Sequence, residues 1–155
     1  MQRFKKIVDC YLDFLGEDLV SIVLFGSHAR GEAKSTSDYD LFIVAARLPA
    51  RPFKRVLFIR SPLIGQFEEK LCIVAKTPEE VLENFPPFFL DLGMDGIILF
   101  DKNDFFRNLQ KKIREIIREA GLQRKKSGRE LYWEWKIPPR KTWELTWSGY
   151  RELES

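Results

Sequence analysis

Cysteine, histidine and long apolar runs are scarce in this 155-residue sequence. The two cysteines, Cys10 and Cys72, lie far apart and show no metal-ligand spacing, so disulfide chemistry is not expected. No run approaches the roughly 18 apolar residues that a membrane span requires, and the first residues lack the pattern of a secretory signal. We therefore expect a soluble, cytoplasmic protein without a membrane partner.

Hydrophobic side chains are plentiful, at 45% of the residues with 14% aromatic, which is enough for a packed core. The net charge of +3 is unevenly distributed. Residues 1–101 carry 12 basic and 15 acidic side chains, a net −3, whereas residues 102–155 carry 14 and 8, a net +6. A basic C-terminal part can favour a polyanion such as nucleic acid, although most such charges only solvate a surface.

Hydrophobic periodicity predicts alternating helices and short strands. Helices are expected at 4–15, 77–84 and 105–120, a helical turn at 27–32, and strands at 20–25, 39–45, 71–75 and 96–100. The segment 53–59 could be a strand or part of a helix. Thr77 and Glu80 have the spacing of a capping box, and Gly121 is a natural end for the last helix. These elements predict one domain over residues 1–121.

Residues 122–155 differ in character and predict a C-terminal extension packed on the domain or on a partner. Lys125–Arg129 is predicted to be a basic linker. Two tryptophan pairs flank the turn-like segment Ile137–Lys141, which indicates a short hairpin or an extended arm. The tryptophans could stack on bases, as in single-strand binders. The favoured alternative is that they pack over the domain or across a homodimer interface.

The end of the strand at 20–25 has the features of an anion-binding loop. Gly26 follows the strand directly and lets the backbone approach a bound group closely, because it has no side chain. Ser27 adds a hydroxyl and an amide. Free N–H groups at the start of a helical turn can hold phosphate oxygens.

Two carboxylates stand at the entry to the next strand. Asp38 and Asp40 are two residues apart, so on a strand they share one face. Paired carboxylate oxygens suit Mg²⁺, which completes its shell with waters and substrate phosphates. Taken alone, Ser-x-Ser-Asp would be ordinary turn chemistry, but the nearby Gly26 and Ser27 favour a metal and phosphate site.

The segments 24–31 (LFGSHARG) and 37–41 (SDYDL) together resemble the signature of the DNA polymerase β-like nucleotidyltransferase superfamily, in particular its minimal nucleotidyltransferases. The resemblance implies an α/β (α+β) fold with a mixed sheet flanked by helices. It also implies transfer of a nucleoside monophosphate from a triphosphate to a hydroxyl, with Mg²⁺ as cofactor. A small helical protein partner, as in toxin–antitoxin pairs, becomes plausible.

Carried over by position, the resemblance assigns a role to each signature residue. Gly26, Ser27 and Arg30 would bind the triphosphate, with Arg30 supporting the loop or contacting phosphate. Asp38 and Asp40 would be catalytic and hold the metal. Arg30 could instead pair with a carboxylate such as Asp38. The single histidine, His28, is expected to pack or face solvent rather than to act in catalysis.

The sequence departs from the family pattern at the third carboxylate, which such enzymes usually carry on a neighbouring strand. Cys72 stands where that acid is expected. Glu68 or Glu69 could supply it if the strand began earlier. Without a third acid, efficient two-metal displacement becomes doubtful.

Three functions follow from these residues. The first is a Mg²⁺-dependent nucleotidyltransferase that modifies a protein or another hydroxyl-bearing acceptor. The second is a nucleotide-binding regulatory or antitoxin-like protein with weakened catalysis, motivated by Cys72. The third is an RNA-binding module, which depends only on the basic, tryptophan-rich C-terminal part.

Overall fold

A computed structural model describes residues 2–153, which fold around a four-stranded sheet in the order β3-β2-β1-β4. The strands are β1 (Leu19–Phe25), β2 (Tyr39–Ala45), β3 (Leu71–Lys76) and β4 (Ile97–Asp101). Strand β1 runs antiparallel to both β2 and β4, whereas β3 is parallel to β2. The predicted mixed sheet is therefore confirmed, and the two central strands are those that lead into the signature residues.

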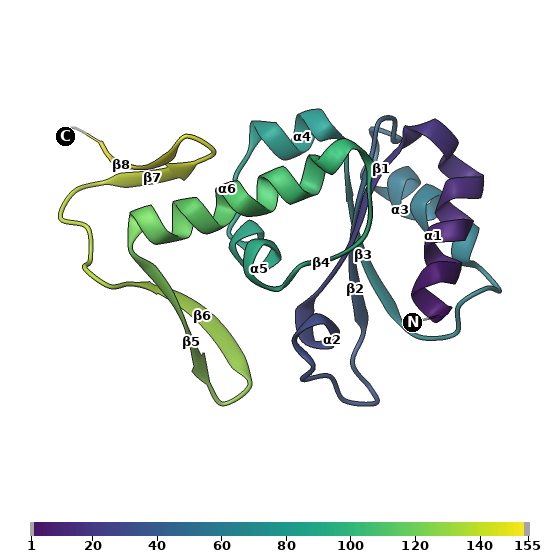
Figure 1. Cartoon of the computed structure of the whole chain (residues 1–155), viewed down its shortest axis with the longest axis horizontal. Coiled ribbons are helices and arrows are strands. Elements are labelled where there is room, and N and C mark those ends of the chain that lie inside the picture. The colour runs from purple at the N-terminus through teal and green to yellow at the C-terminus, as the bar shows by residue number, and fades with distance from the viewer. Residues whose placement is uncertain (1, 154–155) are drawn as a thin grey trace.

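Helices cover both faces of the sheet (Figure 1). One face carries α1 (Gln2–Leu15) and α3 (Pro52–Arg60), and the other carries α4 (Pro78–Glu83), α5 (Phe88–Asp95) and α6 (Phe105–Ala120). The short α2 (Gly26–Arg30) follows β1 directly, and 3₁₀ turns occupy Gly16–Asp18, Ser61–Leu63 and Lys102–Asp104. No helix within residues 2–153 is long and apolar enough to cross a membrane.

The two central strands are buried on both faces because their side chains alternate between two hydrophobic clusters. The cluster toward α5 and α6 includes Val23, Phe42, Phe89, Phe106 and Ile113. The cluster toward α1 and α3 includes Ile7, Tyr11, Ile22, Ile43 and Ile59. The buried Tyr11 hydroxyl donates a 2.6 Å hydrogen bond to the carbonyl of Ile59, which joins α1 to α3. The sheet is thus a rigid platform for the loops at its ends.

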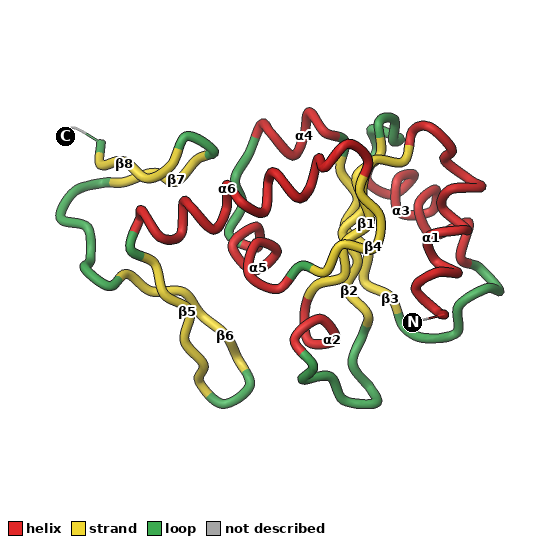
Figure 2. The backbone as a smooth tube through the Cα atoms, viewed as in Figure 1, coloured by secondary structure: helices red, strands yellow, loops and turns green. Residues whose placement is uncertain are grey.

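The C-terminal part forms two separate hairpins, which Figure 2 shows beyond the end of α6. They are β5 (Leu122–Ser127) with β6 (Glu130–Trp135), and β7 (Trp143–Thr146) with β8 (Gly149–Glu152). The predicted linker at 125–129 is therefore wrong, because these residues complete β5 and its turn. The two alternatives for the tryptophan-rich segment, a single short hairpin around 137–141 or an extended arm, are also wrong, since that segment connects two hairpins.

Tryptophans attach both hairpins to the α5 side of the domain. Trp147 packs edge-on against Phe85, and its indole N–H donates to the carbonyl of Val81. Trp133 donates its indole N–H to the Asp91 carboxylate at 3.1 Å. Trp135, Trp143 and Leu122 help to line an apolar cavity of about 300 Å³ against α5. The tryptophans pack on the domain, as the favoured interpretation expected.

Candidate functional site

Gly26 forms the junction between β1 and α2, and two features of the structure require a glycine there. Its φ of +75° lies in the left-handed region that glycine adopts without steric cost. A Cβ at this position would also collide with the Oδ2 of Asp40. Backbone and carboxylate are thus in direct contact, which brings the glycine loop and the acidic strand together into one site.

The two aspartates lie at the start of β2. Asp40 pairs with Phe25 of β1 in the sheet and is partly buried, whereas Asp38 precedes the strand and is exposed. Burial raises the pKa of Asp40, and the nearby charge of Asp38 raises it further, against smaller opposing effects from Cys72, His28 and Arg30. The two residues stand two positions apart at the start of β2, so their carboxylates lie at the same end of the strand.

Two carboxylates beside an open loop fit Mg²⁺, provided that water and substrate phosphates supply its remaining ligands. The structure gives no complete protein cage, because residues 2–153 contain no group of three or more His, Cys, Asp or Glu side chains that could hold a metal ion. Asp38 and Asp40 would therefore hold the metal together with a bound triphosphate, which is how Mg²⁺ is usually bound in phosphoryl-transfer sites.

The expected third-acid position is occupied by Cys72. Strand β3 pairs in parallel with β2, and its register places Cys72 directly beside Asp40. Burial raises the pKa of the Cys72 thiol, and the charges of Asp40 and Asp38 raise it further. A thiol is also a poor ligand for Mg²⁺, because this cation prefers oxygen and the thiolate is the ligating form of cysteine.

Glu68 and Glu69 precede β3 rather than lying on it. The amide of Tyr39 donates to the carbonyl of Lys70, which fixes where the β2–β3 pairing begins. Both glutamates are exposed, and Glu69 lies 3.5 Å from the Arg3 guanidinium. They line a polar pocket of about 490 Å³ beside the loop 34–37. The structure does not join them with Asp38 and Asp40 into a three-carboxylate site.

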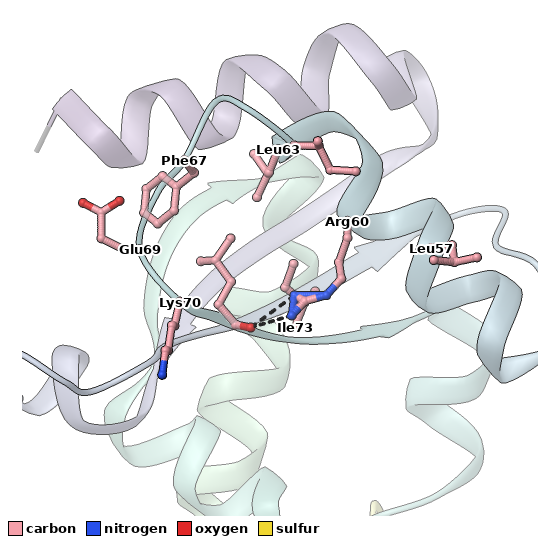
Figure 3. A pocket seen from close by; sticks show the side chains of 9 residues that line it. Leu57, Arg60, Leu63, Phe67, Glu69, Lys70 and Ile73 are labelled. Atoms are coloured by element: carbon pink, nitrogen blue, oxygen red, sulfur yellow. Dashed lines mark hydrogen bonds between the residues drawn. The ribbon is translucent and has the colours of Figure 1, made fainter.

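A second hollow, of about 350 Å³, also has Glu69 and Lys70 in its lining (Figure 3). Leu63, Phe67 and other apolar side chains line it, and Arg60 donates two hydrogen bonds to the carbonyl of Leu71 at its base. It contains none of the signature residues.

His28 supports the loop between α2 and β2. Its ring stacks on Tyr39 with centroids 3.6 Å apart, and its Nε2 lies 3.1 Å from the carbonyl of Ser37. Arg3 donates a hydrogen bond to the Tyr39 hydroxyl from α1. The packing interpretation of His28 agrees with these contacts. The supporting role of Tyr39 was not predicted from sequence, because a tyrosine within an apolar strand gives no sign of its stacking partner.

Arg30 ends α2 and lies close to both halves of the site. Its Nε donates to Glu32 at 2.8 Å, and its Nη1 donates to Asp95 at 3.2 Å. The partner considered from sequence, Asp38, is not among these contacts. The charge of Arg30 lowers the pKa of Asp40, although burial and the charge of Asp38 outweigh it.

Asp95 and Arg124 complete an ionic network that sequence reasoning missed. The Asp95 side chain is only 6% exposed and accepts hydrogen bonds from Arg124 at 2.7 and 2.8 Å, in addition to the one from Arg30. Asp95 lies 65 residues from Arg30 and 29 from Arg124. No local pattern could have revealed these pairs. The network ties the β5–β6 hairpin to the end of α2.

A mixed sheet flanked by helices, with a glycine loop against a strand carboxylate, is the arrangement expected of a nucleotidyltransferase. The sequence model of the nucleotidyltransferase domain matches residues 4–126. The chain therefore belongs to the nucleotidyltransferase domain family and is a nucleotidyltransferase. A relative from Methanocaldococcus jannaschii, provisionally named a protein adenylyltransferase, is 32% identical over 107 residues, which are 66% of this chain and 73% of the relative.

Solved structures support the same fold. A toxin–antitoxin complex with AMP-PNP matches at 16% identity with a TM-score of 0.54, over 75% of this chain and 87% of that chain. A tri-AMPylated HEPN toxin of Shewanella oneidensis in complex with an MNT antitoxin matches at 15% identity with a TM-score of 0.52, over 76% and 86%. At these identities the likeness shows the fold alone.

Proposed function

We propose that this nucleotidyltransferase requires Mg²⁺ and transfers adenylate from ATP to a hydroxyl group of a protein. The observation that carries the proposal is the contact between Gly26 and the Asp40 carboxylate, which joins a phosphate-binding loop to a metal-binding strand. The name of the Methanocaldococcus jannaschii relative supports adenylate as the transferred group and a protein as the acceptor. The toxin–antitoxin complexes of similar fold support a protein partner.

In this proposal each signature residue has one task. The amides of Gly26 and Ser27 hold triphosphate oxygens, and Arg30 supports the loop from its other end. Asp38 and Asp40 bind Mg²⁺, which would offset the negative charge that develops on the phosphates. The acceptor hydroxyl oxygen forms a bond to the α-phosphorus and releases its proton to water, as the bond from that phosphorus to the bridging oxygen breaks and pyrophosphate leaves.

A second candidate function is nucleotide binding with little turnover, in a regulatory or antitoxin-like role. The observation that favours it is Cys72 directly beside Asp40, where a third carboxylate would otherwise lie. A neutral thiol supplies neither a second-metal ligand nor a base of suitable strength. The two candidates share one binding site and differ in whether a phosphorus–oxygen bond is broken.

Labelling of an acceptor by radioactive ATP distinguishes these two candidates. The protein is incubated with Mg²⁺, soluble extract proteins as acceptors and ATP labelled with ³²P at either the α- or the γ-phosphate. Adenylate transfer labels an acceptor from the α-label only, and the label is lost in the Asp38→Ala, Asp40→Ala double variant. Metal-dependent ATP binding by calorimetry without any labelling would support the second candidate. Absence of metal-dependent binding would contradict both.

A further inference from the structure

The β5–β6 hairpin is anchored firmly at its base. Arg124 is 16% exposed, pairs with the nearly buried Asp95, and lies with its guanidinium 5.7 Å from the centre of the Trp133 ring. Charge-assisted, two-pronged pairs of this kind are among the stronger polar contacts in proteins. Because Asp95 also accepts from Arg30, the base of the hairpin is fixed relative to the nucleotide loop. Figure 1 shows the hairpin extending from the end of α6 toward the end of the sheet at which α2 lies.

Toward its tip the hairpin makes a looser contact with the same loop. Lys126 places its ammonium 2.6 Å from the carboxylate of Glu32, two residues beyond Arg30. Both side chains are exposed, that of Lys126 by 51%. Exposed pairs of this kind contribute little to stability and are screened by salt. The long, flexible stem of a lysine lets its charge move while the backbone stays in place.

Glu32 serves two cations at once. Its carboxylate accepts from Arg30 at 2.8 Å and from Lys126 at 2.6 Å, and the hydrogen bond from Lys126, followed by that from Arg30, holds its pKa below the usual range. A triphosphate bound at Gly26 and Ser27 would bring several negative charges into the same neighbourhood. Such a group competes with one exposed carboxylate for both cations.

We propose that Lys126 is a triphosphate-binding residue of this site and moves from Glu32 to the nucleotide phosphates when ATP binds. The inference rests on the proposed function, because it takes the loop Gly26–Ser27 as the place of the triphosphate. In this proposal the β5–β6 hairpin forms one side of the nucleotide site. Arg124 acts through Asp95 as a positioning residue that keeps this hairpin in place.

The adjacent lysine provides a matched control. Lys125 is also 51% exposed and also pairs with a glutamate, Glu134 at 3.0 Å. Because side chains alternate on a strand, Lys125 points to the opposite face of β5 from Lys126. The two lysines therefore have the same charge and exposure and are neighbours in the chain, but their side chains lie on opposite faces of β5.

The test is calorimetric titration of ATP and of AMP, with Mg²⁺, into the full-length protein and three single variants. Lys126→Ala is expected to weaken ATP binding about fivefold to tenfold and to change AMP binding less, since AMP lacks the outer phosphates. Lys125→Ala is expected to stay within about twofold of the unmodified protein. Glu32→Gln, which removes the competitor, is expected to tighten ATP binding about twofold to fivefold.

The direction of the Glu32→Gln effect separates phosphate binding from a merely structural bridge. If the Lys126–Glu32 pair only holds the loop, both Glu32→Gln and Lys126→Ala weaken ATP binding, and the inference is overturned. Equal effects of the two lysine variants would overturn it as well, while metal-dependent ATP binding would leave the proposed function intact. Failure of the unmodified protein to bind ATP would contradict both the inference and the proposed function.

Discussion

The proposed nucleotide loop, residues 26–30, is held in different ways at its two ends. At its start, Gly26 lies against the Asp40 carboxylate so closely that no side chain fits between them, and the β1–β2 ladder fixes both partners. At its end, Arg30 is held by Asp95 and Glu32, which in turn hold two cations of the hairpin. The first attachment is steric and the second is electrostatic.

This difference predicts different kinds of response to change. A steric attachment between backbone and sheet is insensitive to salt and tolerates no added atom. Ion pairs that are partly exposed are screened by salt and can exchange partners. We therefore expect substitutions at the start of the loop to abolish the site, and substitutions at its end to alter affinity in a graded way.

The largest effect is expected from Gly26→Ala. The added Cβ would meet Oδ2 of Asp40, and the left-handed backbone would be strained. Strain and overpacking together should lower the free energy of unfolding by about 2 to 5 kcal/mol. Displacement of the carboxylate should also abolish metal-dependent nucleotide binding. Urea unfolding and ATP calorimetry measure the two effects separately.

Gly31→Ala is the control for backbone strain. Gly31 also has a positive φ, of +72°, but nothing lies within 4 Å of where its Cβ would be. This substitution should cost only the strain, about 1 to 2 kcal/mol, and should leave nucleotide binding measurable. If the two alanine variants lose the same stability and bind ATP equally, the collision with Asp40 is not what makes Gly26 necessary.

Asp95→Asn removes the ion pairs that hold the end of the loop. It leaves Arg30 and Arg124 without their shared carboxylate, for which we expect a loss of about 2 to 3 kcal/mol, below the ~3 to 5 kcal/mol of a fully buried pair because both guanidiniums still reach water. Nucleotide affinity should fall but remain measurable, since the Gly26–Asp40 contact is untouched. Thermal or urea unfolding and ATP titration in low and high salt would measure this.

Asp91→Asn is the control that distinguishes an effect on the hairpin from an effect on the loop. Asp91 accepts hydrogen bonds from Arg124 and Trp133 but does not contact Arg30. It should therefore lower stability without lowering ATP affinity as Asp95→Asn does. Equal losses of affinity in the two variants would show that Asp95 acts through the hairpin alone.

Cys72→Asp tests the start of the loop, because it places a third carboxylate beside Asp40. The apparent affinity for Mg²⁺ should increase about tenfold, which corresponds to roughly 1.4 kcal/mol, and adenylate transfer should rise with it. Without metal, the added charge should destabilise the protein, because Asp38 and Asp40 already repel each other. Cys72→Ser controls for loss of the thiol. Unchanged metal affinity in the aspartate variant would mean that this position does not face the metal.

The sheet end of the site was predictable from sequence, whereas the hairpin end was not. Gly26, Ser27, Asp38 and Asp40 lie within 15 residues, at the end of one strand and the start of its neighbour, so a short motif places them together. The mixed sheet, and Cys72 at the position of the third acid, were implied by the family resemblance that these residues carry. The pairing of Asp95 with Arg30 joins residues 65 apart, which no spacing rule addresses.

Strand β5 escaped prediction for a related reason. Its charged side chains bind partners on both faces, with Arg124 and Lys126 toward the domain and Lys125 toward Glu134. A strand stabilised by ion pairs lacks the apolar alternation on which such predictions depend. The segment 53–59 was undecided because its apolar and basic residues fit both periods. In the structure it is helix α3, with Pro52 at its first turn.

The smallest effect is expected from Glu80→Gln, which removes an ion pair that does not touch the loop. Arg55 donates two hydrogen bonds to Glu80 and lowers its pKa from 4.5 to about 2. A carboxyl with a depressed pKa stabilises the fold above its unfolded pKa, and this contribution is lost as the pH falls from 4.5 to about 2. Because Glu80 is 37% exposed, the loss at pH 7 should stay below about 1 kcal/mol. Urea unfolding should show this difference at pH 7 and its disappearance near pH 2, with unchanged ATP affinity at pH 7. A change in ATP affinity would show that ion pairs far from the loop also position it, and the contrast between the two ends of the loop would then be less local than the contacts indicate.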